Sequence, residues 1–212
     1  SRWLATSSAE AYTGRVFRSD KHVRLWDLNN TNLSAIELQG HDGPITAMAM
    51  SHDSRWLVTG SDDKTARVWN LTDTANGVTS VALPGHKGAV IGMAIAPRNN
   101  WSVTIVTIDE GQEQRSTVDG GPVARMWKLE IDSTDSKTTE PMVVTHNDRP
   151  VSVSRFTTSN DGRRLLLASA STAFVLDLLA GDPMPAPIVL HAHEGEITTA
   201  AFAHDGLSVV TG

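Results

Sequence analysis

The chain has 212 residues, 40% hydrophobic and 20% charged, a balance typical of folded globular proteins that argues against a disordered chain. Its net charge of −6 argues against a general nucleic-acid or anionic-membrane binder, because such proteins depend on clustered lysine and arginine. The sequence has no cysteine for disulfides or a thiolate metal site, and no apolar run reaches the roughly 18–20 residues of a membrane helix.

Short apolar segments separated by turn residues run along the chain, and four of them, which we call strands a to d, recur in one order. Residues 1–39 hold b, c and d, whereas residues 40–84, 85–144 and 145–190 each hold all four. Residues 191–212 hold only a and b. No apolar period of 3.6 residues persists over ten positions, so the sequence predicts strands and no helix.

The predicted strands recur in one order, with a histidine before strand a and, in most repeats, a tryptophan in strand c. Strand a is predicted at Ile45–Met50, Val90–Ile95, Val151–Phe156 and Ile197–Phe202. Strand b is predicted around Ser1–Thr6, Trp56–Gly60, Trp101–Val106, Leu165–Ser169 and Leu207–Gly212. Strand c holds Trp26, Trp69, Trp127 or Leu176, and strand d is predicted at Leu33–Leu38, Val78–Leu83, Pro141–Val144 and Pro187–Leu190. A histidine at position 41, 86, 146 or 193 precedes each strand a. These histidines recur with the same uneven spacing as the tryptophan position of strand c, which argues against a chance alignment.

This order, from Gly40-His41 to Trp69, resembles the WD40 repeat, a unit of about 40–45 residues that forms one propeller blade. The resemblance implies an all-β WD40 β-propeller of about four repeats with four-stranded antiparallel blades. The blades would be residues 1–39 (blade one, partial), 40–84 (two), 85–144 (three), 145–190 (four) and 191–212 (five, partial). Because the chain enters and stops inside strand b, we expect a partial or open propeller from a longer one. Missing blades, a second chain or a second copy would complete it.

The resemblance also implies a buried polar network in blade two. Its members would be His41, Asp63, Trp69 and the hydroxyl of Ser61, with Thr59 as the alternative. Partial copies in the other blades would use Ser8, Asp20, Trp26, His86, Trp127, His146 and His193. A serine, a histidine and an aspartate could also form a hydrolase triad. Recurrence at the blade period together with a tryptophan favours a structural role.

Other residues that could carry chemistry give weaker signals. His191 and His193 could face one side of an extended segment and bind zinc, but no third ligand is evident. The sequence therefore predicts no metal site and no cofactor. We expect Trp3, Trp56 and Trp101 to pack between blades, with exposed binding aromatics as the alternative.

The hairpins between strands b and c of blades one and three are longer than the one in blade two, at roughly Ala9–Arg18 and Thr107–Gly120. The resemblance places both on the face that carries the Gly-His loops, and such loops often carry recognition. The candidate partner-binding residues are Tyr12, Arg15, Phe17, Arg18, Asp109, Glu110, Glu113 and Arg115. The alternatives are solvated extensions without a partner, or hairpins that contact each other or an adjacent domain.

The sequence predicts a non-enzymatic protein-interaction or sensing scaffold, the regulatory WD40 part of a larger protein, in a style similar to bacterial signalling arrays. Its partners would be proteins or adjacent domains, not nucleic acid or a membrane. One alternative is a small-ligand or hydrolytic propeller that uses the central channel, where Arg155 is the one charged residue in a predicted strand a. Another is a structural spacer. The lack of cysteine fits a cytoplasmic location, although an exported protein without disulfides would look the same.

Overall fold

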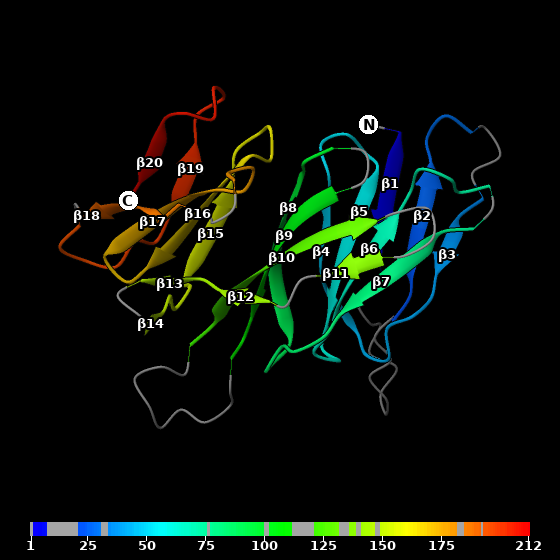
Figure 1. Ribbon diagram of the computed structural model, residues 1–212, viewed down its shortest axis with the longest axis horizontal. Coiled ribbons are helices and arrows are strands. Elements are labelled where there is room, and N and C mark those ends of the chain that lie inside the picture. Colours follow the sequence, from blue (N-terminus) through cyan, green and yellow to red (C-terminus); the bar gives the residue numbers. More distant parts are fainter. Residues whose placement is uncertain are drawn as a thin grey trace, which may run out of the picture.

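A computed structural model describes residues 2–7, 21–30, 34–75, 77–99, 102–111, 121–131, 136–138, 141–146, 149–181, 185–191 and 193–212. These residues form strands and turns without a helix, as the sequence predicts. No membrane-spanning helix is found among them. Figure 1 shows the sheets side by side in chain order, with the first and the last at opposite ends of the row, so the arrangement is open.

Blades one and two lie in the N-terminal half of this row. Blade one is a three-stranded antiparallel sheet of β1 (Trp3–Thr6), β2 (Val23–Asp27) and β3 (Ile36–Leu38). Blade two is a four-stranded antiparallel sheet of β4 (Ile45–Met50), β5 (Trp56–Ser61), β6 (Ala66–Asn70) and β7 (Thr79–Leu83). In both, the strand order in the sheet follows the order in the chain.

Blade three contains β8 (Val90–Pro97), β9 (Ser102–Asp109), β10 (Val123–Ile131), β11 (Ser136–Thr138) and β12 (Met142–Val143), with both short strands paired to β10. A small hairpin follows, made of β13 (Thr145–His146) and β14 (Arg149–Pro150). Blade four is the sheet of β15 (Arg155–Thr158), β16 (Arg164–Ser169), β17 (Thr172–Asp177) and β18 (Ile188–His191). The row ends with β19 (Ala200–Phe202) and β20 (Val209–Thr211) of blade five. The predicted all-β fold of four-stranded antiparallel blades is thereby confirmed.

The start of blade four differs from the sequence prediction. Strand a was expected from Val151, but β15 begins at Arg155. The reason is that the backbone N–H groups of Val151 and Val153 bond to blade three, to the carbonyls of Val144 and Pro122 at 3.0 and 2.8 Å. These two buried valines therefore join the neighbouring blade before the inner strand of blade four begins.

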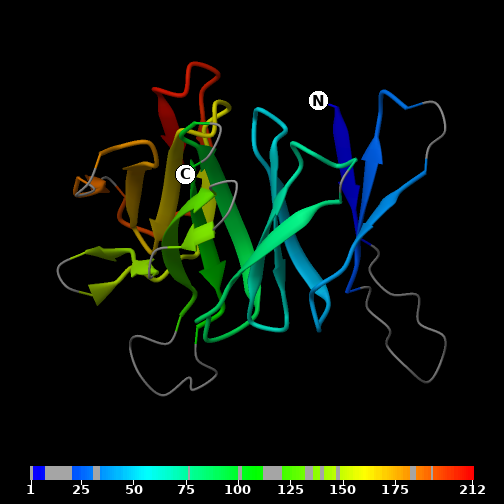
Figure 2. The ribbon, with the colours of Figure 1, turned by 45° about the vertical axis from the view of Figure 1, so that its right-hand side comes forward.

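Figure 2 shows the blades as neighbouring sheets in a row. The hydrophobic core is divided into clusters, each lying between two neighbouring blades. Trp3 of β1 packs with Leu57 and Trp69 of blade two, and Trp56 of β5 packs with Ile105 and Trp127 of blade three. These two tryptophans thus pack between blades as predicted, whereas Trp101 lies outside the described residues. Because each blade buries its faces only against its neighbours, the stability of the row depends on these seams.

Candidate functional site

Four side chains of blade two form one hydrogen-bonded network at the start of strand a. His41 Nδ1 lies 2.9 Å from Asp63 Oδ2, and His41 Nε2 lies 2.8 Å from Thr59 Oγ1. The Trp69 indole N–H donates to the same Thr59 oxygen at 2.9 Å. Because Thr59 and His41 are buried, each of these polar atoms depends on the others for a partner.

One set of proton positions satisfies the whole network. Trp69 Nε1–H donates to Thr59, the Thr59 hydroxyl donates to His41 Nε2, and His41 Nδ1–H donates to Asp63. Burial lowers the pKa of His41, although Asp63 opposes this, so the imidazole stays neutral as the scheme requires. Burial alone would raise the pKa of Asp63, but hydrogen bonds from Thr65, Asp42 and His41 lower it to about 2.

The hydroxyl in this network belongs to Thr59, so the prediction of Ser61 is wrong and its alternative holds. Trp69 pairs with Leu57 across β5 and β6, and Thr59 lies two residues further along β5. That diagonal position is within reach of a large side chain, whereas Ser61 lies two residues beyond it. Ser61 Oγ instead accepts the backbone N–H of Asp63 at 3.1 Å.

The same diagonal pairing recurs in the other blades. Trp26 donates to Thr6 at 2.9 Å, and Trp127 donates to Thr107 at 3.2 Å. The Thr107 oxygen also lies 2.8 Å from His86 Nε2, and that of Thr211 lies 2.6 Å from His193 Nε2. Threonine therefore supplies the hydroxyl wherever the network is described. Ser8 and Asp20, which we named for blade one, lie outside the described residues.

Blade three lacks the aspartate that closes the network in blade two. His86 Nδ1 is buried without a hydrogen-bond partner. Burial, with a contribution from the nearby Arg125 guanidinium, lowers the pKa of His86 to about 4. Asp109, predicted to face a partner, is fully buried and forms an ion pair with Arg125. That prediction is wrong because β9 continues through Asp109, so the hairpin begins only at Glu110.

Blade four has replaced the network by apolar contacts. Leu176 stands at the tryptophan position opposite Leu165, and Leu167 stands at the threonine position two residues along β16. Both are buried in the cluster between blades three and four. Replacing a donor and its acceptor together leaves no unsatisfied polar group, so this exchange costs little. His146 lies in β13, but its side chain is not among those described.

The blade-two network has the order of a hydrolase triad, hydroxyl to imidazole to carboxylate, but its geometry prevents that chemistry. Thr59 has no exposed surface, and its oxygen already accepts the Trp69 N–H. A substrate carbonyl therefore cannot approach the hydroxyl. The arrangement joins strand b, strand c and the loop before strand a, which is a structural role.

The loops before strand a and the b–c connections share one end of the sheets, which we call the hairpin face. Backbone bonds connect them, from Asp62 N–H to the Pro44 carbonyl at 3.0 Å and from Glu110 N–H to the Ala89 carbonyl at 3.0 Å. Glu110 is exposed there. The other predicted partner-binding residues, Tyr12, Arg15, Phe17, Arg18, Glu113 and Arg115, lie outside the described residues.

A hollow of about 700 Å³ lies on the hairpin face between blades three and five. Its polar lining includes Ser152, Arg155, Ser169, Ser171, Glu194 and Glu196. Arg155 donates to the carbonyls of Thr198 and Ser154 at 3.3 and 2.8 Å, so its guanidinium connects blades four and five. The sequence singled out only Arg155 from this set. It missed the others because three separate connections bring them together.

The part of the chain that the structure describes contains no group of three or more histidine, aspartate or glutamate side chains placed to hold a metal ion. His193 is engaged with Thr211 at 2.6 Å, as its place in the repeat implies.

Comparison with known proteins gives the same repeat. The family model described as "WD domain, G-beta repeat" matches residues 33–70. Target of rapamycin complex subunit LST8 of Saccharomyces cerevisiae is 38% identical over 52 residues, which cover 24% of this chain and 17% of that protein. Nuclear distribution protein PAC1 of Tuber melanosporum is 42% identical over 78 residues, covering 36% of this chain and 16% of that protein. The matches thus span about a sixth of the length of these relatives.

The matched segment runs from the end of blade one through the Trp69 strand of blade two, where the full network lies. Blades one and three repeat its threonine–tryptophan pair at the same register. Residues 33–70 thus form a WD40 repeat, and the blades around it resemble those of WD40 β-propeller proteins.

Proposed function

We propose that the chain is a non-enzymatic protein-interaction scaffold that binds its partner with the hairpin face. The observation that carries the proposal is the hollow of about 700 Å³, where Arg155, Glu194 and Glu196 gather with four serines. Charged and hydroxyl groups on a concave surface can bind the backbone and side chains of a protein segment. By contrast, His41 and His86 are buried, and the Nε2 atom of each lies within hydrogen-bond distance of a threonine hydroxyl of its own blade.

The relatives support this assignment in general terms. LST8 is by its name a subunit of the target of rapamycin complex. A role inside a larger signalling protein or complex, in the cytoplasm, is part of the proposal. The name of LST8, a complex subunit, supports the role in a complex, and the lack of cysteine is compatible with the cytoplasm.

A binding experiment with two variants tests the hairpin face. The first variant shortens residues 9–18 and 112–120 to the length of the blade-two turn, and the second carries Glu194→Gln and Glu196→Gln. A partner captured by the wild-type chain would be identified by mass spectrometry, purified and titrated against each variant. We expect at least tenfold weaker binding for one variant or both.

The control shortens residues 132–135, which connect β10 to β11 at the other end of β10. It should bind like the wild type. Equal affinity of all variants would contradict binding at the hairpin face. Turnover of ester or phosphate substrates that His41→Gln or Thr59→Val abolishes would contradict the non-enzymatic role.

A further inference from the structure

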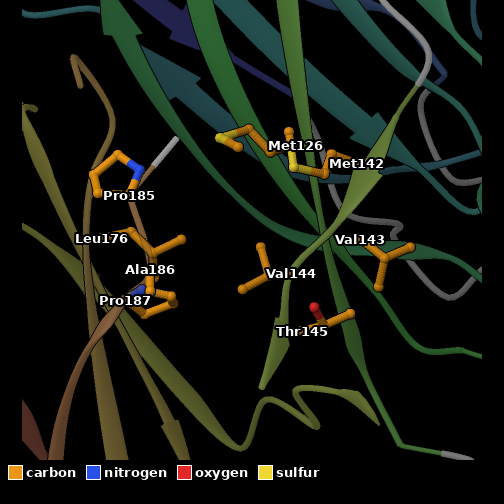
Figure 3. Close-up of a pocket in the computed structure, with 9 residues that line it drawn as sticks. All are labelled: Met126, Met142, Val143, Val144, Thr145, Leu176, Pro185, Ala186 and Pro187. Atoms are coloured by element: carbon orange, nitrogen blue, oxygen red, sulfur yellow. The ribbon is translucent and has the colours of Figure 1, made fainter. Parts of the chain in front are cut away.

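A cavity of about 300 Å³ lies at the seam between blades three and four, apart from the hollow on the hairpin face (Figure 3). Its lining is apolar except for one threonine: Met126, Met142, Val143, Val144, Thr145, Leu176, Pro185, Ala186 and Pro187. Figure 3 shows the two methionines together on the blade-three side, across from Leu176 and the prolines. The inference below is independent of the function proposed for the hairpin face.

The other seams show what occupies the corresponding space. In the seam between blades two and three, the Trp127 indole packs in one cluster with Val68 and Leu83. In the seam between blades one and two, Trp69 packs with Leu25 and Leu38 in the same way. An indole ring thus fills the space between the preceding blade and strand c at both seams.

Blade four has Leu176 where the other blades have this tryptophan. On the opposite wall, Met126 precedes Trp127 as Val68 precedes Trp69. Val144 is bonded to Ala124 of β10 as Leu83 is paired with Ala66 of β6. Met126, Val144 and Leu176 all line the cavity. The vacant volume therefore lies where the repeat places an indole.

We propose that this cavity binds a tryptophan side chain from a partner polypeptide, which takes the place of the missing indole. The cavity continues the interface between the blades, since Met126, Val144 and Leu176 all belong to its core cluster. The two prolines add apolar wall without a backbone N–H that would need a partner. Methionine side chains adapt readily to an aromatic ring.

Thr145 gives the site its preference for tryptophan. A buried indole N–H needs an acceptor, and in blades one to three a threonine hydroxyl supplies it. Thr145 carries the hydroxyl of the cavity lining. A phenylalanine side chain would fill the volume but leave this hydroxyl unused.

Methionine-methyl NMR of the whole chain tests the site, with N-acetyl-tryptophanamide as the probe. We expect it to shift the Met126 and Met142 methyl signals in a saturable way and to leave those of Met48, Met50 and Met93 in place. The Leu176→Trp variant fills the cavity with the chain's own indole and should bind the probe at least tenfold more weakly. Leu207→Trp adds an indole at an exposed position and should bind like the wild type.

Two further variants keep the test decisive if Leu176→Trp does not fold. Met142→Lys changes an exposed residue at the rim and should also weaken binding at least tenfold. Thr145→Val should weaken the binding of N-acetyl-tryptophanamide more than the binding of N-acetyl-phenylalaninamide. The proposal is overturned if the probe shifts neither methionine, or if it shifts the Met126 signal in the Met142→Lys variant as strongly as in the wild type. Binding of free indole without binding of N-acetyl-tryptophanamide would overturn the polypeptide partner and leave a small-molecule cavity.

Discussion

The Thr59 hydroxyl holds two buried nitrogens at once, those of His41 and Trp69. Thr59→Val keeps the shape of the side chain but leaves both nitrogens without a partner. We expect it to lower the free energy of unfolding by about 1–3 kcal/mol, measured by urea denaturation. Ser61→Ala should cost less, because Ser61 Oγ accepts only a turn N–H. An equal or larger loss for Ser61→Ala would contradict the role assigned to Thr59.

His86 should make stability depend on pH in a defined window. Burial and Arg125 lower its pKa from 6.5 to about 4 in the folded chain, so the unfolded chain takes up this proton first. The free energy of unfolding should therefore fall as the pH drops from about 6.5 to about 4. Urea denaturation at steps between pH 7 and pH 4 would show this fall, and His86→Gln should flatten it. Parallel profiles for the two proteins would contradict the prediction.

At the scale of the strand, close approach between blades two and three restricts the residue type. A Cβ atom at Gly60 of β5 would lie 2.6 Å from Val90 Cγ1 and 2.8 Å from the Met93 methyl of β8. Because Val90 is fully buried, this seam cannot open locally. We expect Gly60→Ala to cost about 1–3 kcal/mol of unfolding free energy in denaturant titrations.

Gly181 is the matched control, since no atom lies within 4 Å of an added Cβ there. Gly181→Ala should stay within about 0.5 kcal/mol of the wild type. A comparable loss at both positions would show that the cost comes from removing glycine and not from the seam.

At the scale of the whole molecule, the described row of blades exposes apolar side chains at both ends. Leu4 and Leu28 are 48% and 53% exposed at one end, although Leu57 and Leu71, their equivalents in blade two, are covered by blade one. Leu207 and Val210 are 70% exposed at the other end. Such surfaces favour association with another polypeptide.

We therefore expect this chain, prepared alone, to self-associate, with a light-scattering mass above 22.8 kDa that rises with concentration. Leu4→Lys combined with Leu207→Lys should reduce the association. Ile188→Lys, an exposed position on β18, is the control for added charge and should not. A stable wild-type monomer would show that these ends need no cover.

The sequence by itself determined the all-β repeat, because turn residues, apolar runs and the histidine and tryptophan marks are local patterns that recur with the blades. It also placed His41, Asp63 and Trp69 at equivalent positions in that repeat. The choice of Thr59 over Ser61 needed the strand register, since only pairing across β5 and β6 decides which hydroxyl reaches the indole. Burial of Asp109 likewise depended on where β9 ends.

Tertiary structure alone decided the features that arise between blades. The hollow around Arg155 gathers side chains from three separate connections, and the cavity at Leu176 needs two neighbouring sheets to exist. The Leu176 substitution was visible in the sequence as a departure from the repeat. Its consequence was not, because the volume a missing indole leaves depends on how the facing blade packs.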